Sequence, residues 1–263
     1  MTDPSICVTC GVQFEPSAGV PAHCPVCEDE RQYVGLDGQQ WTTLSDLRRG
    51  HRNMIAPVDP GIYSIHTEPK FAIGQRCLLV QTTSGNVLWD CVTLLDRETV
   101  QRIGDLGGIG AIAISHPHYY STMIEWAEEF DAPVYIHEDD REWARRKSPR
   151  IHFWSGSTCR LNSNATLIRC GGHFEGAQVM HSGNALFTGD VIQVVPDRRW
   201  VSFMRSYPNY IPLSAAAVRR IVESVEPFDF DVVYGAWPKH EVREDAKGAV
   251  RRSAARYIRA IVE

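Results

Sequence analysis

The sequence predicts an α/β protein that carries a small zinc-ribbon-like segment at its N-terminus. Two observations lead to this fold class. Beyond residue 60, short apolar runs of strand length alternate with stretches whose apolar residues recur at helical spacing. Before residue 35, two Cys-x-x-Cys pairs lie in a segment that is too short to bury a core of its own. A chain of 263 residues can form one large domain with such an appendage.

The N-terminal segment contains four cysteines in two closely spaced pairs that are thirteen residues apart: Cys7 and Cys10, then Cys24 and Cys27. Each pair can fold as a tight knuckle with two thiolates facing one ion, and Gly11 can adopt the positive φ that such a turn often needs. Four thiolates complete the closed, tetrahedral shell of a structural Zn²⁺. Two disulfides or four unrelated thiols are the alternatives.

Charge and hydropathy exclude several kinds of partner. The net charge is −5, and in the ribbon five carboxylates accompany a single arginine, Arg31, so nucleic acid is not expected to bind. No apolar run approaches the roughly 20 residues that span a bilayer, and no secretory signal is recognisable, which indicates a cytoplasmic protein with reduced thiols. We expect the ribbon to act as a docking or stabilising module. The expected binding partner of the protein is a small-molecule substrate. The oligomeric state is left open.

Residues 35–60 are predicted to link the ribbon, residues 1–34, to a main domain covering residues 61–263. This linker contains a short helix at residues 43–49 and a proline-rich stretch at residues 56–61. Three strand-like runs follow it, the last two joined by the hairpin turn signal Ser-Gly-Asn: residues 61–66, 77–82 and 87–91.

Helices and strands then alternate along the main domain. Asp96 is a suitable N-cap for a helix at residues 98–106, and a buried strand follows at residues 112–114. Further helices are predicted at residues 121–130, 139–146, 215–225 and 242–262, and further strands at residues 133–137, 151–154, 165–170, 178–181, 185–187 and 230–234. Residues 191–213 show neither pattern. They carry four side chains that could form a lid or substrate wall, with ordinary loop packing as the alternative: Phe203, Arg205, Tyr207 and Tyr210.

Metal-binding side chains follow the ends of several predicted strands. His116 and His118 flank a proline directly after one strand, and His173 follows another in a glycine-rich turn. The same position is taken by Asp90, Asp190 and His240. Because strand ends of packed sheets converge on one edge, these imidazoles and carboxylates are expected to meet there, and they are ligands for first-row metals. Each histidine alone is more often an ordinary polar residue; the ordered set favours a metal site.

The order of these motifs resembles that of the metallo-β-lactamase superfamily. Five segments carry the resemblance over about residues 60–245: strand–Asp90, His116-Pro117-His118, Gly171-Gly172-His173, Thr188-Gly189-Asp190 and a late His240. The resemblance implies an αββα sandwich, in which two mixed sheets are flanked by helices and the metal site lies on one edge between them. It also implies that Asp90 orients the histidine loop. The ribbon lies outside the resemblance.

The second motif departs from the family pattern, His-x-His-x-Asp-His. Tyr120 and Ser121 replace the last two ligands, and a hydroxyl is a poor zinc ligand unless it loses its proton, which for tyrosine occurs near pH ~10. One active-site metal ion is therefore predicted, Zn²⁺ with iron or manganese as alternatives. The residues that the resemblance assigns to it are His116, His118, His173 and Asp190, with His240 as a further ligand or hydrogen-bonding group.

These residues predict a metal-dependent hydrolase that acts on an ester, lactone, thioester, amide or phosphoester. A bound ion lowers the pKa of water and polarises the substrate. Asp190 would hold or deprotonate the water, and Tyr120 would donate a hydrogen bond to the developing oxyanion, with His240 as the third catalytic candidate.

Two other functions fit the same residues. His116, His173 and Asp190 can form the two-histidine, one-carboxylate triad of a mononuclear non-haem iron enzyme, and the superfamily resemblance includes a persulfide dioxygenase branch that uses such a set. A catalytically degenerate family member whose ribbon docks a partner is the third reading. The metal content of the purified protein would separate these functions.

Overall fold

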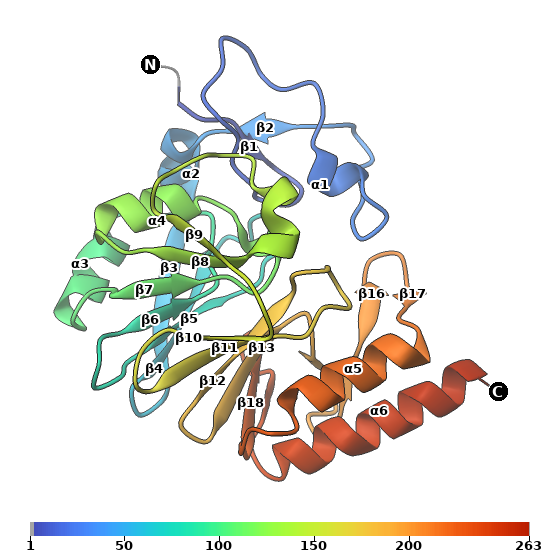
Figure 1. Cartoon of the computed structure of the whole chain (residues 1–263). Coiled ribbons are helices and arrows are strands. Elements are labelled where there is room, and N and C mark those ends of the chain that lie inside the picture. Colours follow the sequence, from blue (N-terminus) through green and yellow to red (C-terminus); the bar gives the residue numbers. More distant parts are fainter. Residues whose placement is uncertain (1–2, 263) are drawn as a thin grey trace.

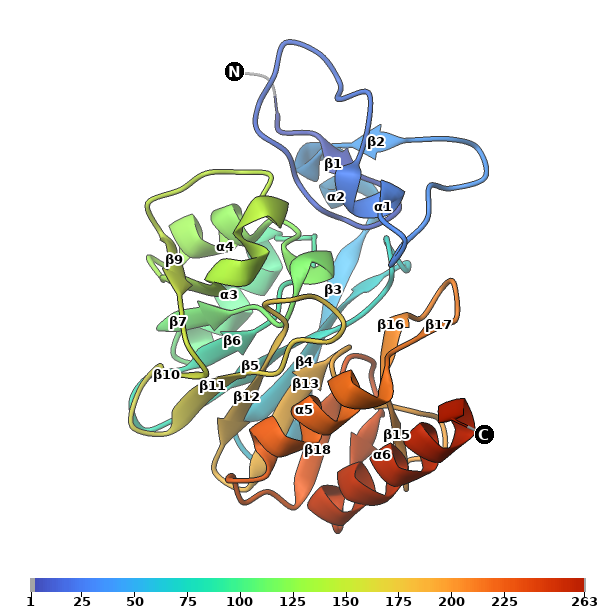
Figure 2. The ribbon, with the colours of Figure 1, turned by 45° about the vertical axis from the view of Figure 1, so that its right-hand side comes forward.

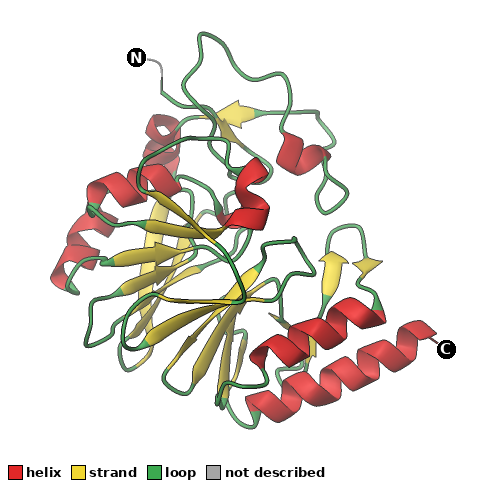
Figure 3. Ribbon diagram, viewed as in Figure 1, coloured by secondary structure: helices red, strands yellow, loops and turns green. Residues whose placement is uncertain are grey.

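The computed structural model describes residues 3–262 and shows two mixed β-sheets packed face to face with helices outside both (Figures 1 and 3). This four-layer αββα arrangement confirms the predicted fold class. The ribbon elements lie together at one end of the sandwich (Figure 2). Within residues 3–262, no helix combines the length and apolar composition that crossing a bilayer requires.

The first sheet has seven strands in chain order: β3 (Arg52–Asp59), β4 (Ile62–Glu68), β5 (Cys77–Val80), β6 (Val87–Trp89), β7 (Ala111–Ala113), β8 (Val134–His137) and β9 (Ile151–Trp154). Strands β3 to β6 pair antiparallel, and β6 to β9 pair parallel. The outer face is covered by α3 (Arg97–Asp105) and α4 (Met123–Glu129). Asp96 caps α3 as predicted, since its carboxylate accepts from the Thr99 N–H at 2.7 Å.

The second sheet has six strands in the order β10 (Thr158–Arg160), β11 (Ala165–Arg169), β12 (Gln178–Ser182), β13 (Ala185–Gly189), β18 (Val232–Gly235) and β19 (Glu241–Val242). Helices α5 (Ala215–Val225) and α6 (Ala246–Val262) cover its outer face. The two sheets share a buried layer that includes Trp89, Met180 and Phe187. Burial of such apolar side chains is the main force that holds the sheets together.

The ribbon contains β1 (Ile6–Cys7) and α1 (Pro25–Glu28), and β1 pairs with β2 (Trp41–Thr42) of the predicted linker. Its four cysteines belong to the same buried cluster as Leu79 and Ile112 of the first sheet. The ribbon therefore extends the core of the main domain and is not a separately packed appendage.

Several elements differ from the sequence prediction. The short helix predicted in the linker is present as α2 (Leu44–Gly50), but the proline-rich stretch belongs to the edge strand β3, where Pro57 is tolerated because an edge strand needs fewer ladder hydrogen bonds. The helix predicted at residues 139–146 is a 3₁₀ helix, η2 (Glu138–Trp143). The predicted loop at residues 191–213 contains two small hairpins: β14 (Gln193–Val194) with β15 (Val201–Ser202), and β16 (Met204–Ser206) with β17 (Ile211–Pro212).

Candidate metal centre

The histidine loop begins where β7 ends, and a buried carboxylate holds its first residue. Asp90 follows β6 with a φ of +64° and accepts a hydrogen bond at 2.7 Å from the backbone N–H of Ser115. His116 and His118 then lie on either side of the start of a 3₁₀ turn, η1 (Pro117–Tyr119). Asp90 is thus placed to orient this loop.

Four side chains from three loops converge on one point. Each of His116, His118, His173 and Asp190 offers a ligand atom that lies within 4.8 Å of the other three. His173 Nε2 is 3.4 Å from His118 Nδ1, and His116 Nε2 is 3.6 Å from Asp190 Oδ2. Nitrogen ligands bound at about 2.0–2.1 Å to a tetrahedral ion are themselves about 3.4 Å apart, so this spacing fits a Zn²⁺-sized ion.

The four side chains are buried, with exposed fractions of 1% for His116 and His173, 3% for His118 and 8% for Asp190. Among the described residues, His116 Nε2 and Asp190 Oδ1 have no hydrogen-bond partner. Leaving buried polar atoms unpaired costs about 1–3 kcal/mol each, which a bound cation would offset. The donor set therefore fits a metal ion on chemical grounds as well as by spacing.

Hydrogen bonds at the far ring nitrogens orient two of the imidazoles. The Ser115 hydroxyl lies 2.8 Å from His116 Nδ1, and His173 Nδ1 lies 3.1 Å from the Met204 carbonyl oxygen, to which it can donate. Both contacts leave Nε2 directed at the shared point, because a hydrogen bond at the far ring nitrogen orients a metal-binding histidine. The Phe174 ring lies 5.1–5.9 Å from the three imidazole rings and closes one side of the site.

Burial determines the protonation of these groups. Burial, followed by the neighbouring imidazoles, lowers the pKa of His116 well below its ordinary value, and burial lowers the pKa of His173 to about 4. Both are neutral at physiological pH and can offer a lone pair to a metal ion. Burial raises the pKa of Asp190 to about 7, so a nearby cation would favour its ionised form.

Gly189 allows the end of β13 to approach the histidine loop. Its φ is +52°, and a Cβ atom there would lie 2.5 Å from the Ser115 hydroxyl oxygen that contacts His116. We expect Gly189→Ala to lower the free energy of unfolding by about 1–3 kcal/mol, because both the backbone and the contact are strained, and to weaken metal binding by moving Ser115. Urea denaturation and metal titration measure the two effects.

Gly183→Ala is the matched control. Gly183 also has a positive φ, +60°, but a Cβ atom there meets open space. The Gly183→Ala variant should therefore reproduce the backbone strain of Gly189→Ala and leave the metal affinity unchanged. Equal metal affinity in both variants would contradict the role assigned to the contact with Ser115.

Tyr120 and Ser121, which replace the second-site ligands, point away from the four donors. The Tyr120 hydroxyl donates to the Asp140 carbonyl oxygen at 3.2 Å, and Ser121 Oγ donates to the Cys91 carbonyl oxygen at 3.3 Å. Burial raises the pKa of Tyr120 well above its ordinary value, so it is not a phenolate ligand. The tyrosine that contacts the site is Tyr119, whose ring lies 5.3 Å from that of His116.

His240 lies outside the four-residue group, although it was predicted as a ligand and catalytic residue. Its Nδ1 lies 3.2 Å from the carbonyl oxygen of Pro238. Next to it, Glu241 forms a buried ion pair with Arg76 at 2.8 Å, and Arg76 also donates to the Gly235 carbonyl oxygen. These contacts hold the loop after β18, and His240 stays a predicted further ligand or hydrogen-bonding group.

The four ribbon cysteines form a second group of donors, again within 4.8 Å of one another. Cys7 Sγ is 3.5 Å from Cys27 Sγ, and Cys10 Sγ is 3.7 Å from Cys24 Sγ. Thiolates bound at about 2.3 Å to a tetrahedral ion are about 3.8 Å apart, so the spacing fits Zn²⁺. All eight cysteines are free and Gly11 has the anticipated positive φ of +82°.

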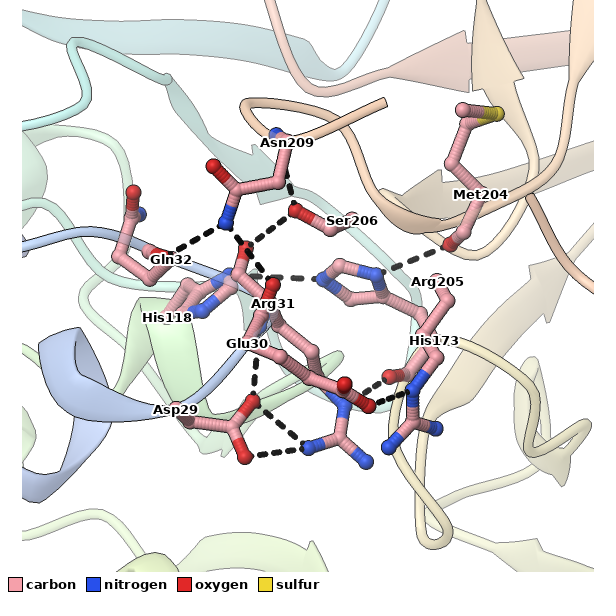
Figure 4. Close-up of polar contacts among 10 residues, drawn as sticks. All are labelled: Asp29, Glu30, Arg31, Gln32, His118, His173, Met204, Arg205, Ser206 and Asn209. Carbon is pink, nitrogen blue, oxygen red and sulfur yellow. Dashed lines mark hydrogen bonds and ion pairs between the residues drawn. The ribbon is translucent and has the colours of Figure 1, made fainter. Parts of the chain in front are cut away.

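Arg31 of the ribbon reaches the metal centre, although it was not predicted as a site residue. Its side chain is 7% exposed, and its Nε donates to the His173 carbonyl oxygen at 2.6 Å (Figure 4). Its guanidinium carbon lies 4.4 Å from the centre of the Phe174 ring. The available signal was its position as the one cationic residue of an acidic segment, just after the second cysteine pair.

The segment predicted as a lid lies beside the site in part. The Tyr207 hydroxyl donates to the carbonyl oxygen of Asp190 at 3.1 Å, and Arg205 pairs with Glu30 of the ribbon. Phe203, in contrast, is a fully buried core residue, and Tyr210 is 83% exposed.

The sequence of this chain was compared with those of known proteins. The chain matches no protein-family model. It is 53% identical over 264 aligned positions to the uncharacterized protein YmaE of Bacillus subtilis (strain 168), covering 97% of this chain and 96% of YmaE.

Solved structures of metallo-β-lactamases are similar in fold at low sequence identity. DIM-1 aligns with a TM-score of 0.61 at 15% identity, covering 80% of this chain and 98% of DIM-1. The enzyme from Hirschia baltica aligns with a TM-score of 0.56 at 17% identity, covering 77% of this chain and 96% of that enzyme. FIM-1 from Pseudomonas aeruginosa, in its mono-zinc form, aligns with a TM-score of 0.58 at 13% identity, covering 78% of this chain and 95% of FIM-1. The chain therefore belongs to the same protein family as YmaE of Bacillus subtilis, and its fold is that of the metallo-β-lactamases.

Proposed function

We propose that this protein is a metal-dependent hydrolase with one metal ion at its catalytic centre. The observation that carries the proposal is the convergence of His116, His118, His173 and Asp190, all buried, with ligand atoms within 4.8 Å of one another. The similarity to metallo-β-lactamases supports the fold on which this centre is built.

Different residues of the site would have different roles in hydrolysis. When bound, a metal ion supplies Lewis acidity and lowers the pKa of water. The three neutral imidazoles would hold it. Asp190, whose Oδ1 has no partner among the described residues, would orient the attacking water and accept its proton. Phe174 and Tyr119 limit the access of bulk water to the imidazoles, which strengthens electrostatic interactions there.

One ion is proposed because the side chains at the second-site positions are engaged elsewhere. Tyr120 and Ser121 donate to backbone oxygens, and His240 lies outside the group. The mono-zinc form of FIM-1 is a precedent for one ion in this fold. A mononuclear iron oxidoreductase is the second candidate, because two histidines and Asp190 of the same group make the required ligand triad.

Metal content and a substrate panel test the proposal together. Anaerobically purified protein should hold two zinc ions per chain, and His118→Ala should hold one. The wild type should hydrolyse at least one of an ester, lactone, thioester, amide or phosphodiester substrate, and His118→Ala should not. Iron together with oxygen consumption would favour the oxidoreductase. One ion in both proteins would refute the proposal.

A further inference from the structure

The ribbon covers the metal centre through the segment that follows its second cysteine pair, residues 29–32, here called the clasp. We propose that the clasp positions His173 for metal binding, so that the thiolate-bound ribbon is a working part of the catalytic centre. The proposal rests on the proposed metal-binding function of the histidine group. Arg31 is its positioning residue.

Arg31 grips the backbone of the His173 loop in a fixed geometry. Its guanidinium donates from Nη1 to both carboxylate oxygens of Asp29, at 2.8 and 2.9 Å, and from Nε to the His173 carbonyl oxygen. It also lies over the ring of Phe174. A planar guanidinium held by two hydrogen bonds and an aromatic face has one orientation, so its third bond fixes the backbone of His173.

The clasp also holds the hairpin formed by β16 and β17. Ser206 Oγ donates to the Arg31 carbonyl oxygen at 3.0 Å. The side-chain amide of Asn209 donates to two other carbonyl oxygens of the clasp, those of Glu30 and Gln32, at 2.9 Å each. Figure 4 shows these contacts on one side of the clasp and the Asp29 ion pair on the other.

That hairpin in turn orients the His173 ring. Its residue Met204 provides the carbonyl oxygen that lies 3.1 Å from His173 Nδ1, and this contact directs Nε2 towards His118. The clasp therefore acts on His173 twice, on its backbone through Arg31 and on its ring through the hairpin. Hydrogen-bonding partners of a metal ligand set the orientation of that ligand.

The position of the clasp depends on the ribbon cysteines. Helix α1 begins after Cys24, contains Cys27 and ends at Glu28, so the clasp is its direct continuation. The Cys27 N–H donates to the Cys24 carbonyl oxygen at 2.9 Å, which closes the knuckle. An ion held by these thiolates would fix the direction in which the chain enters the clasp, and thereby the place of Arg31 over the histidine loop.

A cobalt titration tests the proposal without a known substrate. Metal-free protein would be reloaded with one equivalent of Zn²⁺, which the thiolates take first, and Co²⁺ would then be titrated while its absorption is followed. Arg31→Gln should weaken the Co²⁺ affinity of the histidine site about tenfold, with the ribbon zinc retained. Arg31→Lys should behave similarly, because an ammonium group lacks the planar fork. Arg219→Gln, an exposed arginine on α5, is the control.

Asn209→Ala gives an independent result if Arg31 variants do not fold, since Asn209 is exposed. It should weaken Co²⁺ binding in the same direction by a smaller factor. Wild-type affinity in Asn209→Ala and in any Arg31 variant that folds would overturn the role of the clasp while leaving the metal centre intact. Absence of any Co²⁺ binding that depends on His118 in the wild type would instead refute the proposed function.

Discussion

Replacing Cys27 with serine is expected to release the ribbon metal ion and to lower the free energy of unfolding by more than about 4 kcal/mol. The four thiol groups are buried and share one cluster with the apolar residues of the first sheet, so the loss of the ion would leave poorly packed polar atoms inside the core. Zinc content per chain and urea denaturation measure the two effects.

Cys159→Ser is the control for this change. Cys159 lies in β10, is partly exposed and does not belong to the thiolate group. Its replacement should leave both the zinc content and the unfolding midpoint close to those of the wild type. If Cys27→Ser retained its zinc and its stability, the assignment of a structural metal to the ribbon would be wrong.

Glu241→Gln should destabilise the protein by about 3–5 kcal/mol, because it leaves the buried charge of Arg76 without its carboxylate countercharge. The two side chains are 4% and 1% exposed and lie 2.8 Å apart. Arg76 precedes β5 of the first sheet and Glu241 begins β19 of the second, so their contact ties the two sheets together. The midpoint of urea denaturation is the measurement.

A second ion pair supplies the comparison. Glu226 pairs with Arg251 at the surface, where the side chains are 45% and 55% exposed. Glu226→Gln should leave the midpoint almost unchanged, because solvent screens an exposed pair. If the two substitutions lowered the unfolding midpoint equally, burial would not be the reason that the Arg76–Glu241 pair stabilises the protein.

The sequence predicted the layers of the fold and the meeting of its metal-binding residues from short-range patterns. Alternating strands and helices indicated an α/β chain, and the resemblance in motif order indicated the αββα sandwich that the structure confirms. His116 and His173 were grouped because each follows a strand, and strand ends of packed sheets meet at one edge. The cysteine pairs could be assigned from spacing alone.

Contacts between distant parts of the chain could not be predicted in this way. Arg31 and His173 are 142 positions apart, and no periodicity links a ribbon knuckle to a glycine-rich turn. His240 also follows a strand, but it is not among the four residues whose ligand atoms lie within 4.8 Å of one another, so its role as a further ligand or hydrogen-bonding group stays a prediction. The strand containing Pro57 was read as linker because proline signals a break, while the sheet edge tolerates it.

The burial of the four donors affects how fast an ion or a substrate can exchange between the site and bulk water. Their exposed fractions are 8% or less, and the clasp and the β16–β17 hairpin are joined over them by hydrogen bonds. We expect an ion or a substrate molecule that passes between the histidines and bulk water to need a local opening, and these hydrogen bonds are the contacts that we expect to break. Release of an ion bound there to a chelator should therefore be limited by opening of this cover, and a less firmly held ribbon would speed that release without altering any ligand.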